Sequence, residues 1–225
     1  MATKKTDVIE IKPIEIAQVN IRIVGDTPLI MHAWDPGAKH AILIAQQGAK
    51  KGKAKERKNP VVDFINSMYW LTEKPDVFND MKEEECEERF NEAIAKGARF
   101  GFPVTAFKQA AISAAYRLGW SKDKASLRGV FFIESDEDGL VEIKGDAPVI
   151  REDMVRIGMG TADIRYRGEF RNWYADLTVT YNVNGNYDVN SIINIINAGG
   201  YVCGVGEWRP ERDGQYGMFH IQPTR

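Results

Sequence analysis

The sequence predicts an α+β protein built around one antiparallel sheet. Two stretches, 9–24 and 174–181, alternate between apolar and polar residues, as half-buried strands do. Two others, 104–117 and 189–198, have the apolar pattern of helices that pack on a sheet. Shorter strand patterns lie at 128–134, 140–144 and 216–222. The order strand, helix, strand, strand, helix, strand predicts a ferredoxin-like or RNA-recognition-type split βαβ core.

Length and composition fit a single domain with insertions. The chain has 225 residues, 44% of them hydrophobic, which is enough for a sizeable core. We expect one domain over 1–225, with insertions at about 35–100 and 146–172. Cys86 and Cys203 are too few for a disulfide scaffold, and the three histidines lack metal-ligand spacing. We therefore predict no metal and no cofactor.

No apolar run approaches the length of a membrane span, and no secretory signal opens the chain. The expectation is a soluble cytoplasmic protein without membrane contact. The formal net charge of −2 argues against a globally basic nucleic-acid binder.

Charge is nevertheless segregated along the chain. Residues 39–58 contain seven Lys or Arg against one acid, and residues 73–92 contain nine acids against three bases. Within the first segment, 46–59 is rich in Lys and Gly and predicts a basic loop that contacts nucleic acid; a solvated linker is the alternative. Its candidate contacts are Lys50, Lys51, Lys53, Lys55, Arg57 and Lys58.

Two helices are expected between this loop and the first core helix. Pro60 opens an apolar helical pattern over 60–71. An acidic helix is plausible over 81–96, with its carboxylates on a solvated face.

The core helix that follows carries an unusual cation. Thr105 can act as its N-cap. Lys108 lies in its first turn, where the helix dipole disfavours a positive charge unless an anion shares the site. Lys108 is therefore a candidate contact, with a merely exposed lysine as the alternative.

Further along, 128–134 and 140–144 flank a turn and predict a β-hairpin. Residues 149–171 read as irregular, with arginines among aromatic residues, a composition that suits a single-stranded backbone and its bases. The candidate contacts in this segment are Arg156, Arg165, Arg167 and Arg171.

A glycine-bracketed loop, 204–219, lies between the second core helix and the last strand. Gly204, Gly206, Gly214 and Gly217 permit positive φ and close backbone approach. Between them lie side chains suited to phosphate and to bases, and these are the candidates Trp208, Arg209 and Arg212. The alternative is a β-hairpin whose glycines only serve its turns.

Three motifs give the sequence a family resemblance. A Thr-Pro-Leu segment follows the first strand, Phe102-Pro-Val-Thr-Ala-Phe-Lys-Gln-Ala110 opens the core helix, and Gly204-Val-Gly-Glu-Trp-Arg209 opens the loop. In this order they resemble the RAMP superfamily, and more narrowly the backbone subunit of type I and type III CRISPR effector complexes. Thr105 and Ala106 stand where that family usually has serines, and Gln109 where it usually has glycine.

The resemblance implies a subunit that binds guide RNA through its backbone and assembles side by side with other copies. It implies that Lys108 meets phosphate, that 149–171 forms a thumb, and that 46–59 follows the strand. Related RAMP endoribonucleases cleave RNA with a histidine, and His32 after the first strand occupies a comparable place.

The sequence therefore predicts a non-catalytic protein that binds single-stranded RNA or DNA, as a homo-oligomer or in a CRISPR-like assembly. The alternatives are a metal-independent endoribonuclease using His32, and a decoy of a CRISPR subunit that makes contact through its acidic segment 73–92.

Overall fold

A computed structural model describes residues 12–34, 43, 58–157 and 161–223, and it confirms the α+β class. Its four-stranded antiparallel sheet has the order β10-β1-β9-β5. The strands are β1 (Ile16–Gly25), β5 (Phe131–Ile133), β9 (Tyr174–Asn182) and β10 (Phe219–Ile221). Along the chain they alternate with α4 (Val104–Arg117) and α5 (Val189–Val202) in the order β1, α4, β5, β9, α5, β10.

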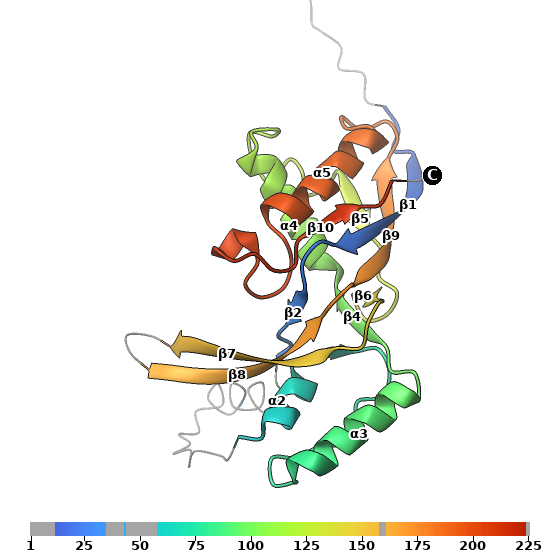
Figure 1. The fold of residues 1–225 in the computed structure, drawn as a ribbon. Helices are drawn as coiled ribbons and strands as arrows, with labels where there is room; N and C mark the ends of the chain where they lie inside the picture. The colour runs from blue at the N-terminus through green and yellow to red at the C-terminus, as the bar shows by residue number, and fades with distance from the viewer. Residues whose placement is uncertain (1–11, 35–42, 44–57, 158–160, 224–225) are drawn as a thin grey trace, which may run out of the picture.

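Alternation fixes which face of this sheet is covered. Ile21 pairs with Leu177 and Ile23 with Ala175, and all four side chains are buried. The helices α4 and α5 cover this face (Figure 1). The residues between them in β1 and β9 point to the other face, because successive side chains of a strand alternate.

The second core helix is longer than predicted, since it includes two glycines that were expected to end it. The expected stop at Gly199 and Gly200 is wrong, and α5 continues to Val202. A Cβ on Gly199 would lie 2.7 Å from the backbone nitrogen of Ala111 in α4, and one on Gly200 would collide with the carbonyl oxygen of Phe219. These glycines bring α5 close to α4 and β10.

The segment 149–171 is not irregular; it is a β-hairpin. Strands β7 (Val149–Ile157) and β8 (Thr161–Phe170) pair antiparallel, and β2 (Leu29–Met31) joins them in a three-stranded sheet. The hairpin projects from the rest of the molecule in Figure 1. The sequence hid it because charged residues occupy the positions of one face, where an apolar alternation would be expected.

The strands at 128–134 and 140–144 are real but do not pair with each other. Strand β5 pairs with β9, whereas β6 (Leu140–Ile143) pairs with β4 (Phe100–Pro103) in a third sheet with β3 (Tyr69–Trp70). The predicted hairpin is therefore wrong, and the connection between β5 and β6 runs from one sheet to another.

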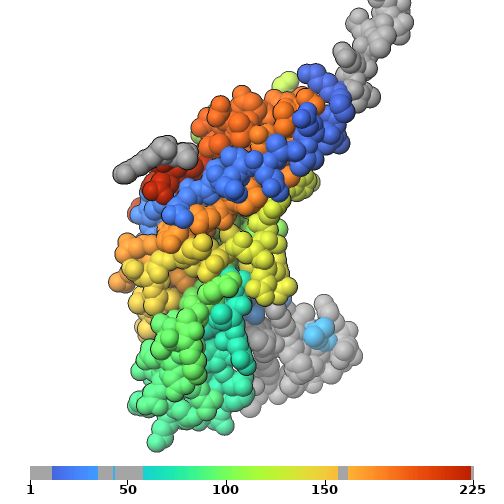
Figure 2. Space-filling view, turned by 90° about the vertical axis from the view of Figure 1, so that its right-hand side faces the viewer, coloured from blue at the N-terminus to red at the C-terminus, as the bar shows by residue number. Residues whose placement is uncertain are grey.

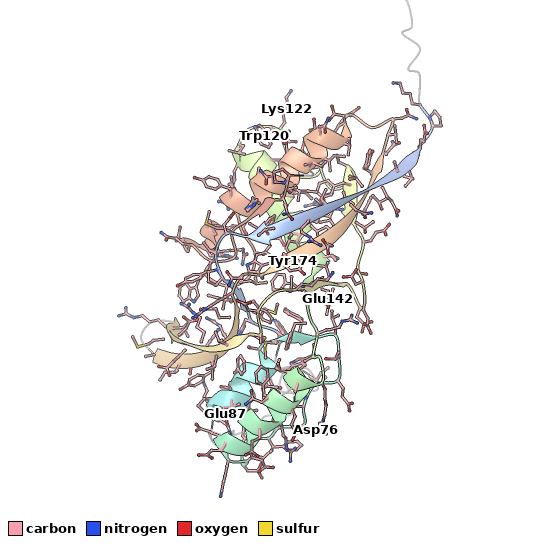
Figure 3. All side chains as sticks on the ribbon, turned by 45° about the vertical axis from the view of Figure 1, so that its right-hand side comes forward. Asp76, Glu87, Trp120, Lys122, Glu142 and Tyr174 are labelled. Atoms are coloured by element: carbon pink, nitrogen blue, oxygen red, sulfur yellow. The ribbon has the colours of Figure 1, made fainter. Side chains whose placement is uncertain are left out.

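The range 35–100 holds two further helices in its described part. Helix α2 (Pro60–Asn66) begins at the expected proline and is capped by the side chain of Asn59, but it ends before β3 instead of reaching residue 71. The acidic helix α3 (Glu83–Ala95) forms as predicted. Figure 3 shows its Glu87, with Asp76, at the end of the molecule opposite Trp120. Among the helices described, none is both long and apolar enough to cross a membrane.

Candidate functional site

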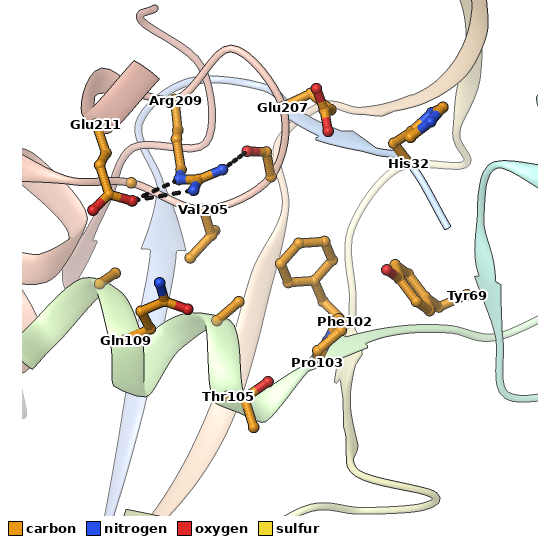
Figure 4. Close-up of a pocket in the computed structure, with 14 residues that line it drawn as sticks. His32, Tyr69, Phe102, Pro103, Thr105, Gln109, Val205, Glu207, Arg209 and Glu211 are labelled. Atoms are coloured by element: carbon orange, nitrogen blue, oxygen red, sulfur yellow. Dashed lines mark hydrogen bonds and ion pairs between the residues drawn. The ribbon is translucent and has the colours of Figure 1, made fainter. Parts of the chain in front are cut away.

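A cavity of about 280 Å³ lies where the glycine-bracketed loop faces the start of α4. The loop contributes residues 204–207, Arg209 and Glu211, and α4 contributes its first turns. Tyr69 and His32 close the opposite end (Figure 4). The loop motif and the α4 motif of the family resemblance therefore lie beside the same cavity, together with His32, which follows β2.

The loop has the backbone that its glycines predict. Gly204, Gly206 and Gly217 have φ of 63°, 80° and 64°, in the left-handed region. The Glu207 N–H donates to the Ile30 carbonyl at 3.0 Å, and a Cβ on Gly206 would lie only 2.5 Å from that oxygen. The loop is therefore fixed against β2. Its two limbs also bond to each other, from the Val205 N–H to the Gly217 carbonyl at 2.9 Å and from the Tyr216 N–H to the Trp208 carbonyl at 3.0 Å, although neither limb forms a strand.

The first turn of α4 lies beside the cavity, and the N–H of its first residue, Val104, donates to the Gly139 carbonyl at 3.0 Å. Its N-cap is Pro103 and not Thr105, and no side chain caps the helix. Thr105, Ala106 and Gln109 line the cavity beside it. Backbone N–H groups in the first turn of a helix have no partner inside it, and together with the helix dipole they favour an anion.

Lys108 does not join this cavity. It points to another side of α4, where its Nζ lies 3.9 Å from the ring centroid of Phe132 and 5.9 Å from that of Phe131. Partial burial lowers the pKa of its ammonium. The rings of Phe131 and Phe132 on β5 face the misplaced charge. Lys108 therefore does not line the cavity between the loop and α4, and its contact with phosphate stays a prediction.

Arg209 holds the loop together from within. Its guanidinium donates to the Glu211 carboxylate at 3.1 Å and to the Gly206 carbonyl at 2.9 Å, as the dashed lines in Figure 4 show. Glu211 also pairs with Arg117 at 3.4 Å. These internal partners occupy Arg209, so its predicted role as a free phosphate contact is corrected to a structural one.

Arg167 is likewise a structural residue. Its side chain is only 2% exposed, and it pairs with Asp153 at 3.0 Å and with Glu207 at 3.6 Å. Its Nε lies 3.4 Å from Nδ1 of His32. A nucleic-acid strand cannot reach this guanidinium, which joins the hairpin to the loop and to the end of β2.

At this end of the cavity, the pKa values of His32 and Tyr69 are both shifted in the direction that favours the neutral side chain. Partial burial, and secondarily the charge of Arg167, lowers the pKa of the His32 imidazole. Burial, with a contribution from Glu207, raises the pKa of the Tyr69 phenol. At neutral pH the cavity therefore presents a neutral imidazole and a neutral phenol.

Several of the other predicted cations already have acidic partners. Arg171 pairs with Glu169 at 2.7 Å, while Lys58 and Arg165 share Asp163 at 2.7 and 3.7 Å. Within the ranges that the structure describes, four of the five arginines of 149–171 pair with carboxylates, and Arg156 does not.

Three predicted residues are exposed and take part in no ion pair among the described residues. Arg156 on β7 and Arg212 in the loop are exposed and have no ion pair among the described residues. Trp208, with φ of 52°, is 39% exposed. The candidates Lys50, Lys51, Lys53, Lys55 and Arg57 lie outside the described residues.

Tyr69, Phe102 and Glu207 line the cavity without having been predicted. Phe102 belongs to the motif that opens α4, which was a usable signal. Tyr69 had none, because its position was assigned to a helix. No group of acidic, histidine and cysteine side chains in the described part of the chain is arranged to hold a metal ion.

Comparison with known proteins adds no family to this geometry. No protein-family model and no curated protein matches the sequence.

Proposed function

We propose that this protein binds single-stranded RNA or DNA through backbone phosphates, without catalysing a reaction. The observation that carries the proposal is the uncapped start of α4, which opens into the cavity beneath the glycine-bracketed loop. A helix start of this kind binds phosphate through backbone N–H groups and needs no lysine.

The surrounding charges are compatible with an anion. Glu207 and Glu211 line the cavity, but Arg167 pairs with the first, and Arg117 and Arg209 pair with the second. Exposed Trp208 and Arg212 lie along the same loop, where an indole can stack on a base and a guanidinium can pair with the next phosphate. The antiparallel sheet β10-β1-β9-β5 and the alternation of its strands with α4 and α5 support the proposed split βαβ core, a type of fold that often binds single strands.

Thr105→Glu tests this site directly. Position 105 is exposed and lies in the first turn, where a carboxylate favours the helix itself, so the variant should fold. A bound phosphate would be repelled, and we expect affinity for a labelled oligonucleotide to fall at least about tenfold. Fluorescence anisotropy measures this for oligo-dT and oligo-U over a range of salt concentrations.

Ala125→Glu is the matched control, because it adds the same charge at an exposed position remote from the cavity. It should leave affinity nearly unchanged. Equal loss in both variants would show that only overall charge matters. Wild-type protein that binds neither oligonucleotide at low salt, or binds without salt dependence, would refute the proposed function.

A second candidate, metal-independent RNA cleavage, is favoured by one observation: His32 and Tyr69 line the same cavity. A neutral imidazole can take the proton of a ribose 2′-hydroxyl, and a neutral phenol can donate a proton to a leaving oxygen. RNA is incubated in the presence of a chelator with wild type, His32→Ala and Tyr69→Phe. Cleavage that both substitutions abolish would establish the enzyme and overturn the non-catalytic proposal.

A further inference from the structure

Helix α5 is a surface helix without a single charge. Its 14 residues, Val189–Val202, contain no Asp, Glu, Lys or Arg, although 28% of the whole chain is charged. A helix of this length on an ordinary soluble surface carries about four. Loss of charged residues together with exposed aromatic side chains is the signature of an interface core.

The exposed residues of α5 form one stripe. Asn190, Asn194, Asn197 and Tyr201 follow one another at helical spacing, and Tyr201 is 74% exposed. Hollows of about 700 and 690 Å³ flank the stripe. One lies against β1, and the other is lined by aromatic and apolar side chains, including Trp120, which is 50% exposed.

Next to this stripe, β1 has an open edge. It pairs with β9 from Ile16 to Val24 but with β10 only from Ile23 to Gly25. The carbonyl of Arg22 accepts from Gln222 on the β10 side. Backbone groups alternate in direction along a strand, so those of Gln18 and Asn20 point to the same side. Among the described residues, no strand pairs there.

Figure 2 shows β1, in blue, lying uncovered along the surface of the molecule. The open part of this edge, Ile16–Asn20, contains no proline and no charge. Natural proteins protect an edge with such residues or cover it, since unpaired N–H and C=O groups recruit another strand.

We propose that a second copy of this chain covers this surface, with β1 pairing antiparallel to the β1 of its partner across a two-fold axis. The α5–β1 surface comprises the open backbone edge of Ile16–Asn20 and the side chains of Asn190, Ile193, Asn194, Asn197 and Tyr201. The pairing would join two four-stranded sheets into one and bring the two α5 helices together on the same face.

The chemistry of the α5–β1 surface selects a copy of itself as the occupant. In a two-fold interface the same patch meets itself, so any charge near the axis would face a like charge. The α5 stripe has none, and the two charges that line the adjoining hollow, Arg22 and Asp176, neutralise each other in an ion pair at 2.7 Å. Asn and Gln amides carry both donors and an acceptor, so an amide patch is complementary to itself. The pairing is independent of the proposed nucleic-acid binding, and a two-fold interface closes as a dimer instead of extending into a filament.

Asn194→Glu tests the helix contribution. Light scattering after size-exclusion chromatography and nuclease treatment should give twice the 25.4 kDa of one chain for the wild type. The variant places like charges face to face, and the dimer dissociation constant should rise at least about tenfold. Asn79→Glu, the same change at an exposed position before α3, should leave the dimer intact.

Gln18→Pro tests the strand edge. It removes the N–H that points to the open side and spares the β9 ladder, so the dimer should weaken, whereas Gln18→Thr keeps the N–H and should dimerise. Hydrogen exchange should show the amides of Gln18 and Asn20 protected in the wild type and exposed in monomeric Asn194→Glu. A monomeric wild type, a larger open assembly, or a dimer that survives both Asn194→Glu and Gln18→Pro would overturn the proposal.

Discussion

The β7–β8 hairpin and the α5–β1 surface have opposite charge contents, and in neither does the charge content alone show how the region would meet a partner. The hairpin is the arginine-rich part of the described chain, yet Arg151, Arg165, Arg167 and Arg171 all pair with carboxylates. The α5–β1 surface has no charge, yet it faces solvent. The comparison teaches that charge counted along the chain does not measure the charge available to a partner; cross-strand neighbours decide that.

The hairpin substitution with the largest expected effect on stability is Arg167→Met. The substitution removes one of the two arginines that pair with Asp153, a carboxylate only 8% exposed, and leaves it with Arg151 at 2.9 Å. We expect a loss of about 2–3 kcal/mol in the free energy of unfolding, measured by urea denaturation. Arg171→Met, at an arginine whose side chain is 61% exposed, should cost no more than about 1 kcal/mol. Equal costs would show that Arg167 is not a structural ion.

Gly200→Ala probes the other half, because the position of α5 depends on its close approach to β10. The added Cβ collides with the Phe219 carbonyl oxygen, and overpacking of this kind costs about 1–3 kcal/mol. Gly129→Ala, with no atom within 4 Å of the new Cβ, should change stability by less than about 0.5 kcal/mol. Thermal unfolding compares the two, and an unaffected Gly200→Ala would contradict the packing described.

The smallest expected effect comes from His32, whose pKa is lowered by partial burial and secondarily by the charge of Arg167 in the adjoining hairpin. Its pKa is lower in the folded protein than the unperturbed value of about 6.5, so the unfolded chain binds the proton more readily. Stability should therefore fall as pH drops through about 6.5 and level off below the folded pKa. The change stays below about 1 kcal/mol, because the ring is partly exposed and solvent screens it.

The measurement is urea denaturation of wild type and His32→Asn across this pH range. The difference between the two proteins isolates the contribution of His32 from those of the other ionisable groups. If that difference increases toward acid in favour of the wild type, the pKa of His32 is raised by folding and not lowered.

The sequence predicted an element best where the residues that specify it lie close together along the chain. The alternation in β1 and β9 and the proline that begins α2 each act within a few residues, and all three elements form. Strand β9 has nearly the predicted bounds, whereas β1 begins only at Ile16 and α2 ends at Asn66. The glycine loop was also predictable, since positive φ at Gly204 and Gly206 is a local requirement.

What the sequence concealed depends on partners far along the chain. Gly199 and Gly200 resemble a helix stop until Ala111 and Phe219 are placed against them. In the candidate site, the loop and the α4 motif were both named from the sequence, and both line the same cavity. The availability of Arg167 was misjudged, because its carboxylate partner lies fourteen residues away across a strand pair.

The short connection from β8 to β9 makes the hairpin and the central sheet a single lever. Only residues 171–173 separate the strands, and the Trp173 indole, buried in that joint, donates to the Thr27 carbonyl at 2.9 Å. A displacement of the hairpin would therefore act first on this joint, and through it on β9 in the interior of the four-stranded sheet.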